Sequence, residues 1–179
     1  MRLIYITNSR IPTEKAHGIQ IMKMCEAFAC NGTEVILLLP KRRNNIKEDI
    51  FTYYGIKQSF KIVKLPVLDF IGWYIPFAFF IATTSFAVSC FVWLMIQKGK
   101  AVVYTRGEIV LFFTRWIPRR YSLFWESHIK PHNINRYKRI FAKVIGIVVV
   151  TKHYMQELIS LGVEKERLFL APDAVDISL

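Results

Sequence analysis

Three polar side chains follow two apolar runs in the second half of this sequence, and their types suit proton transfer or anion binding. Arg106 comes directly after the run at 101–105, and Glu126 and His128 follow the run at 122–125. A histidine can donate a hydrogen bond to a phosphate or hydroxyl, or move a proton near neutral pH. A nearby glutamate can fix the tautomer of that ring or bind a sugar hydroxyl. These residue types indicate a site for a phosphorylated or hydroxyl-bearing ligand.

A second candidate lies near the amino terminus, where His17 and Gly18 precede an amphipathic helical pattern that starts at Ile19. The first turn of a helix has unpaired N–H groups and the positive end of the dipole, so it can receive an anion. Gly18 has no Cβ and lets a ligand approach the backbone. The same pattern also fits an ordinary strand-to-helix turn without a ligand, and His17 fits either a ligand contact or a solvated position.

The elements that must position these residues alternate between short apolar runs and helical patterns. The expected strands are Leu3–Thr7, Glu34–Leu39, Phe60–Lys64, Ala101–Thr105, Ser122–Trp125, Gly146–Val150 and Arg167–Ala171. The expected helices are Ile19–Asn31, Ile75–Gln97, Glu108–Trp116, Ile134–Lys143 and Lys152–Leu161, the last with Thr151 as N-cap and Gly162 just beyond its end. Several strands are apolar on both faces, which predicts an α/β domain of three layers with a mostly parallel sheet, Rossmann-like in architecture. The basic segment 41–45 is expected to be a solvated loop.

In an open α/β sheet, ligands bind outside the carboxyl ends of the strands. Gly18, Arg106, Glu126 and His128 all come after such an end, so we expect them to face one crevice. The alternative for His128 is a loop histidine with a structural hydrogen bond. His128 and His132 are four residues apart, but Pro131 breaks the helix that such a metal-binding pair needs and no third ligand is evident, so no metal is expected.

Composition narrows the function classes. The chain has 179 residues, is 53% hydrophobic and carries a formal net charge of +12, which favours anionic partners. A nucleic-acid partner is not expected, because no recognised motif accompanies the charge. The three cysteines form no Cys-x-x-Cys pair, and residues 1–8 look like a strand of the fold rather than a secretory signal, so we expect reduced thiols and a cytoplasmic protein.

The segment 70–97 contains no charged residue and is long enough to span a bilayer. Three interpretations stay open: a buried crossover helix, a helix that docks shallowly into one leaflet, and a true membrane span. A span would place the first three strands and the last four on opposite sides of the membrane. Lysines on both sides of the segment would favour docking on anionic lipid.

Taken in order, these features resemble the N-terminal domain of glycosyltransferase family 4, the retaining enzymes of the two-domain GT-B fold. The matching features are the strand at 1–7, Gly18 before its helix, the segment 102–106, Glu126-Ser127-His128, the strand and helix from 147 onward, and Ala171-Pro172-Asp173-Ala174-Val175-Asp176. The resemblance covers nearly the whole chain and implies a single domain over 1–179, half of a GT-B fold.

The resemblance also implies roles for individual residues. Gly18, with His17 beside it, would offer its backbone N–H to the donor diphosphate, although many family members have a second glycine where this chain has His17. His128 would lie beside the reacting sugar as the catalytic residue, and Glu126 and Arg106 would shape the acceptor side. The co-substrate would be a nucleotide sugar, without a metal or other cofactor.

The expected function is therefore the acceptor-binding half of a retaining glycosyltransferase that moves a sugar from a nucleotide diphosphate sugar to a lipid-linked glycan acceptor. The protein would act in polysaccharide biosynthesis, peripherally at the inner face of the membrane. A C-terminal donor domain or a partner chain would complete the enzyme, and the 179 residues alone are expected to have little or no transferase activity. The alternative is a non-catalytic truncated or split subunit that binds membrane or a partner chain.

Overall fold

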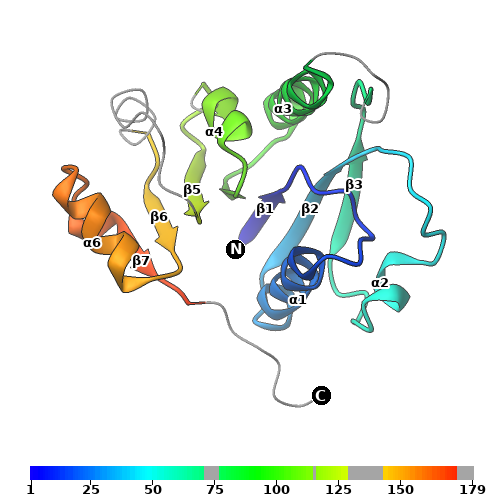
Figure 1. The fold of residues 1–179 in the computed structure, drawn as a ribbon, viewed down its shortest axis with the longest axis horizontal. Helices are drawn as coiled ribbons and strands as arrows, with labels where there is room; N and C mark the ends of the chain where they lie inside the picture. Colours follow the sequence, from blue (N-terminus) through cyan, green and yellow to red (C-terminus); the bar gives the residue numbers. More distant parts are fainter. Residues whose placement is uncertain (71–76, 115, 129–142, 173–179) are drawn as a thin grey trace.

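The computed structural model describes residues 1–70, 77–114, 116–128 and 143–172 of the chain, and its centre is one parallel sheet. The strand order is β3-β2-β1-β4-β5-β6-β7, and every neighbouring pair is parallel (Figure 1). The strands are β1 (Arg2–Ile6), β2 (Glu34–Pro40), β3 (Lys61–Leu65), β4 (Ala101–Thr105), β5 (Tyr121–Ser127), β6 (Gly146–Val149) and β7 (Leu168–Leu170). The predicted Rossmann-like α/β fold is confirmed.

Helices cover both faces of this sheet and make it the middle of three layers. They are α1 (Ala16–Cys30), α2 (Ile50–Tyr53), α3 (Ala78–Ile96), α4 (Glu108–Thr114) and α6 (Lys152–Ser160), with a 3-10 turn at Lys165–Arg167. Because side chains alternate along a strand, β1 sends Leu3 and Tyr5 to the face under α1 and α2, and Ile4 and Ile6 to the face under α3, α4 and α6. The sheet therefore has a buried core on each side.

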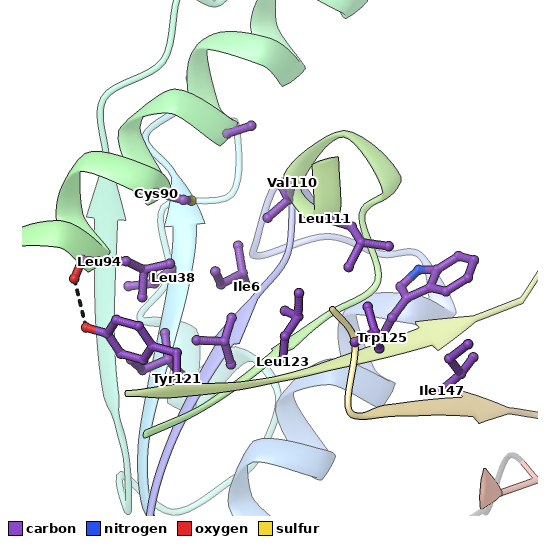
Figure 2. Packing of buried hydrophobic residues seen from close by; sticks show 14 of the residues in the cluster. Ile6, Leu38, Cys90, Leu94, Val110, Leu111, Tyr121, Leu123, Trp125 and Ile147 are labelled. Atoms are coloured by element: carbon purple, nitrogen blue, oxygen red, sulfur yellow. Dashed lines mark hydrogen bonds between the residues drawn. The ribbon is translucent and has the colours of Figure 1, made fainter. Parts of the chain in front are cut away.

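The core under α3 and α4 is the larger and contains the most bulky buried side chains (Figure 2). Trp125 of β5 is 1% exposed, and Leu38 of β2 and Cys90 of α3 are fully buried. Burying a large apolar side chain stabilises the fold by roughly 1.5–3 kcal/mol. The strands that position the candidate site are therefore part of a well-buried core.

The expected elements are recovered with small shifts at their ends. Helix α1 begins at Ala16 rather than Ile19, because Lys15 is the extended residue before it, and Gly18 therefore lies within its first turn. Helix α6 has the predicted cap, with the Thr151 hydroxyl accepting from the Tyr154 N–H, and Gly162 has a positive φ of 88°. The short helix α2 was not expected, and the helix expected at 134–143 falls almost entirely outside the described residues.

The long apolar segment forms α3, which crosses from β3 to β4 over one face of the sheet (Figure 1). It is the one helix among the described residues that is long and apolar enough to cross a membrane. A span is incompatible with this sheet, since β1 precedes α3 and yet pairs with β4, which follows it. Two hydrogen bonds join α3 to the chain after β3. The Ser85 hydroxyl accepts from the Leu68 N–H, and the Ser89 hydroxyl donates to the Pro66 carbonyl.

Two residues, Arg120 just before β5 and Tyr121 at its start, hold the carboxyl end of α3. Arg120 donates from Nη2 to the carbonyls of Leu94, Met95 and Gln97 at 3.2, 3.1 and 2.8 Å. The Tyr121 hydroxyl donates to the Leu94 carbonyl at 2.8 Å, as Figure 2 shows. A cation at this end opposes the negative end of the helix dipole. The helix is thus anchored to the sheet on its inner side, while its outer side exposes apolar residues.

Candidate functional site

The predicted residues Arg106, Glu126 and His128 meet at the carboxyl ends of β4 and β5. These strands are parallel neighbours with Thr105 opposite Trp125, so the next position on each brings Arg106 beside Glu126. Arg106 Nε lies 3.3 Å from Glu126 Oε1, and His128 Nε2 lies 2.6 Å from the same oxygen. The shared edge expected from the sequence therefore places these three side chains in direct contact.

Glu126 is the centre of this cluster and is held as a carboxylate. It is 3% exposed, and its second oxygen, Oε2, accepts a 2.7 Å hydrogen bond from the Tyr104 hydroxyl. Burial alone would raise the pKa of Glu126, but the hydrogen bond from His128, the charge of Arg106 and the hydrogen bond from Tyr104 together lower it. The group is an acceptor for its neighbours rather than a proton donor near neutral pH.

The ionised Glu126 also decides the tautomer of His128. Nε2 of His128 contacts both Glu126 Oε1 and Arg106 Nη2, and this nitrogen cannot donate to one and accept from the other at once. With the carboxylate charged, a proton on Nε2 is favoured. Nδ1 is then the ring nitrogen that can accept a hydrogen bond from a further group.

Arg106 connects this cluster to the first helix. Its Nη1 donates to Oε1 of Gln20 at 3.0 Å, and Gln20 lies two positions beyond Gly18 in α1. His17 and Arg106 line the same pocket. Burial, together with the charges of Lys15 and Arg106, lowers the pKa of His17. The structure therefore brings all five predicted site residues to one edge of the sheet.

Gly18 has a packing reason to be a glycine. A Cβ at this position would collide with the Tyr54 hydroxyl and lie 2.6 Å from Thr13 Cγ2. The Tyr54 hydroxyl forms two hydrogen bonds with the Thr13 backbone: it accepts from the Thr13 N–H at 2.7 Å and donates to the Thr13 carbonyl at 2.9 Å. The Gly18 N–H itself donates to the Lys15 carbonyl at 2.9 Å. A phosphate contact of Gly18 stays a prediction.

A pocket of about 910 Å³ opens beside the cluster, at the carboxyl ends of β1 to β4. It is lined by Thr7, Asn8, Ser9, Arg10, Thr13, Lys15, His17, Lys41, Arg42, Arg43, Asn45, Val67, Asp69, Phe70, Phe79, Arg106 and Gly107. Among the described residues of this lining, Asp69 is the one carboxylate, against six lysine and arginine residues. The excess of positive charge suits an anionic ligand, and Arg106 belongs to both the pocket and the cluster.

Three contributors to this region were not singled out from the sequence: Tyr104, Gln20 and Arg42. Tyr104 is part of an apolar strand, and nothing in the pattern shows that its hydroxyl reaches Glu126 on the next strand. Arg42 belongs to the segment 41–45, which was expected to be solvated; this expectation is wrong for Arg42, whose side chain is 9% exposed. Gln20 could have been found from the sequence by one signal: it stands two residues after Gly18, in the first turns of a helix expected to receive a ligand.

Within the described ranges, no group of three or more His, Cys, Asp or Glu residues is arranged to hold a metal ion. His132, the partner considered for His128, lies outside the described residues. The site in view is thus built from an arginine, a carboxylate and an imidazole. Groups of these types can form hydrogen bonds, stabilise charge and transfer protons.

No protein-family model and no curated protein matches the chain. Solved structures do match its fold. The catalytic domain of starch synthase IV from Arabidopsis thaliana, bound to ADP and acarbose, has a TM-score of 0.66 at 11% identity, covering 99% of this chain and 52% of that one. Sucrose-phosphate synthase from Thermosynechococcus elongatus has a TM-score of 0.63 at 13% identity, covering 99% and 49%.

The lipopolysaccharide outer core galactosyltransferase WaaB has a TM-score of 0.60 at 12% identity, covering 99% of this chain and 47% of that one. These neighbours are glycosyltransferases of the GT-B fold, and this chain spans about half the length of each. At such low identity the likeness establishes the fold alone: the chain has the architecture of one half of a GT-B protein.

Proposed function

We propose that this domain is the acceptor-binding half of a glycosyltransferase that moves a sugar from a nucleotide diphosphate sugar to a lipid-linked glycan acceptor, with retention of configuration. The observation that carries the proposal is the contact of Arg106, Glu126 and His128 at the carboxyl edge of the sheet, beside a basic pocket. The fold supports it, because sucrose-phosphate synthase, starch synthase IV and WaaB, which share this architecture, are sugar-transferring enzymes.

In this proposal the buried charges have distinct tasks. Glu126 and Tyr104 hold the His128 ring so that Nδ1 faces the reacting sugar, and Arg106 places positive charge where the leaving diphosphate develops negative charge. The acceptor hydroxyl attacks from the face on which the diphosphate leaves, and a phosphate oxygen takes its proton. The nucleotide sugar is held by a second domain or partner chain, and no metal is required.

Residues on the outer side of α3 support a membrane location. Val88, Val92, Met95 and Ile96 are 42%, 53%, 46% and 68% exposed, and two exposed lysines, at 98 and 100, follow them. An apolar helix face flanked by cations suits shallow docking on anionic lipid. We propose that the protein binds the cytoplasmic membrane surface through this face, which keeps the sheet intact.

The transfer assay uses the protein produced in its own cellular background, so that a donor half is present. Extracts receive a panel of radiolabelled nucleotide diphosphate sugars, and the label in the lipid fraction is counted. Glu126→Gln and His128→Ala should each lower transfer about 10- to 150-fold, the loss expected for a hydrogen bond to a charged group. His153→Ala, an exposed histidine on α6, is the matched control.

Two results would oppose the proposal. Label that never enters lipid or glycan, with any donor, would favour the non-catalytic alternative. Equal transfer by the His128→Ala and His153→Ala variants would remove His128 from the reaction. The configuration of the new linkage, measured by NMR, tests retention separately.

Membrane docking has its own test. Sedimentation with anionic vesicles should fall about tenfold for Val88→Ser with Val92→Ser, because two apolar side chains then leave the interface. Ile19→Ser, which changes an exposed residue on the opposite face of the sheet, should bind like the wild type. Equal binding by all three proteins would exclude α3 as the membrane contact.

A further inference from the structure

The lining of the basic pocket contains two unlike groups of residues. Arg10, Lys41, Arg42 and Arg43, which follow β1 and β2, are called its charged side, and Val67, Phe70 and Phe79 are called its apolar side. A ligand that fits both sides must carry negative charge at one end and apolar surface at the other. A simple sugar has neither.

Arg42 is the deepest cation on the charged side. Its side chain is 91% buried, and Nη2 donates to Asn8 Oδ1 at 2.9 Å. Its Nε lies 4.0 Å from Asp69 Oδ1, beyond hydrogen-bond distance, and in the described part of the chain both atoms are buried without a hydrogen-bond partner. Burial, with the charge of Arg10 added to it, lowers the pKa of Arg42, and the charge of Asp69 opposes this effect. A guanidinium buried to this degree with one carboxylate near it favours a further anion at the pocket.

The apolar side of the pocket continues outward at the start of α3. Phe79 lines the pocket and is 66% exposed, and Phe77 and Phe80 beside it in the chain are 80% and 57% exposed. Leu68, next to the pocket residue Val67, is 57% exposed. Four large apolar side chains, in the lining or within two positions of a lining residue, are thus open to solvent, and they favour an apolar chain that leaves the pocket there.

We infer that this pocket binds the phosphate or diphosphate of an acceptor whose other end is a hydrocarbon chain. The phosphate lies against Arg42 and Arg10, and the chain passes Val67 and Phe79 to the exposed rim. This inference rests on the proposed function, in which this half of the enzyme binds the acceptor. It adds the chemical class of that acceptor and the residues that select it. Charge-assisted hydrogen bonds from guanidinium groups are the interactions that suit phosphate.

Three soluble probes separate the two sides: farnesyl diphosphate, inorganic diphosphate and UDP. Calorimetry with the whole chain should give at least about tenfold tighter binding of farnesyl diphosphate than of inorganic diphosphate, because apolar surface adds to the same charge. Arg42→Gln should weaken both ligands about tenfold or more. Phe79→Ser should weaken farnesyl diphosphate alone.

Two further variants guard the interpretation. Because Arg42 is buried, Arg42→Gln can disturb folding as well as binding. Arg10→Gln changes an exposed side chain in the same pocket, and it should weaken the binding of both diphosphates without that effect. Arg119→Gln, which removes an exposed cation ahead of β5, should change neither. Any of three results would overturn the inference. The two diphosphates could bind with equal affinity, UDP could bind more strongly than farnesyl diphosphate, or Arg10→Gln and Arg42→Gln could both leave the affinity unchanged.

Failure of this inference differs from failure of the proposed function. Sugar transfer that persists in Arg10→Gln and Arg42→Gln variants would leave the transferase intact and remove the phosphate site. Farnesyl diphosphate binding with the expected variants, but without any transfer in extracts, would keep the site and remove the reaction.

Discussion

The Tyr104 hydroxyl of β4 donates a 2.7 Å hydrogen bond to Oε2 of Glu126 on the neighbouring parallel strand β5, and this hydrogen bond is buried. The other carboxylate oxygen of Glu126 faces His128 and Arg106. Tyr104 is therefore a positioning residue: it touches the carboxylate that holds the histidine, and burial keeps its own pKa well above the usual value, so that it stays a donor.

Tyr104→Phe should destabilise the fold by about 1.5–3 kcal/mol near neutral pH, because the buried carboxylate loses a donor. The folded pKa of Glu126 lies below its unfolded value, so this stabilisation is present above about pH 4.3 and is lost as pH falls through the folded pKa. The variant should flatten that loss. Urea unfolding between pH 3 and 7 measures how the free energy of unfolding depends on pH, and Tyr53→Phe on α2 is the control. If Tyr104→Phe and the wild type show the same dependence on pH, the role assigned to Tyr104 is wrong.

Gly18→Ala should lower the free energy of unfolding by about 1–3 kcal/mol through overpacking against Tyr54 and Thr13. This loss exceeds the gain of up to about 1 kcal/mol in helix propensity that alanine brings. In a Tyr54→Phe background the same substitution should cost less, because the colliding oxygen is gone. A thermal-melt cycle of the four proteins tests the coupling, and additive effects would show that the clash is relieved elsewhere.

Arg120→Met should destabilise the chain by about 1–3 kcal/mol, since three carbonyls at the end of α3 lose their shared cation. Arg119→Met removes an equal charge from the adjacent, exposed position and should change stability by less than about 0.5 kcal/mol. Denaturant midpoints of the two variants provide the comparison. Similar midpoints would mean that Arg120 does not anchor the helix.

Cysteine labelling reports whether α3 stays on the sheet. Cys25 and Cys90 are buried, which raises the pKa of each thiol, whereas Cys30 is exposed. A thiol reagent should therefore modify Cys30 alone in the native protein. Adding anionic vesicles should leave Cys90 unmodified, because docking through the outer side of α3 keeps its inner side packed. Rapid labelling of Cys90 with vesicles would indicate that the helix leaves the sheet.

The order of strands and helices was predictable because short apolar runs alternate with helical patterns along most of the chain, and several of these runs are apolar on both faces. The run 146–149 is buried between two helical layers and shows no polar alternation, which is typical of a central parallel strand. The edge shared by Arg106, Glu126 and His128 followed from this topology alone. The start of α1 was misplaced because Ala16 and His17 carry no strong start signal, and the first turn forms without a side-chain cap.

The details of the site depended on contacts between distant residues, which no local pattern contains. Arg42 was expected in solvent because it stands among charged residues, yet the chain after β3 folds over it and brings Asp69 within 4.0 Å. Gly18 fitted either a ligand contact or an ordinary turn, and no local pattern showed that Tyr54, 36 positions later, occupies the space beside it. Long-range packing determines the surroundings of both residues.

The place of β1 between β2 and β4 has a consequence for biosynthesis. The amino-terminal strand obtains its second neighbour only after residues 101–105 have left the ribosome, and α3 emerges before them. During translation the apolar helix therefore lacks half of the sheet that later shelters it. Nascent chains halted when α3 but not residues 101–105 has left the ribosome should crosslink to chaperones, and chains halted after β7 has also emerged should not.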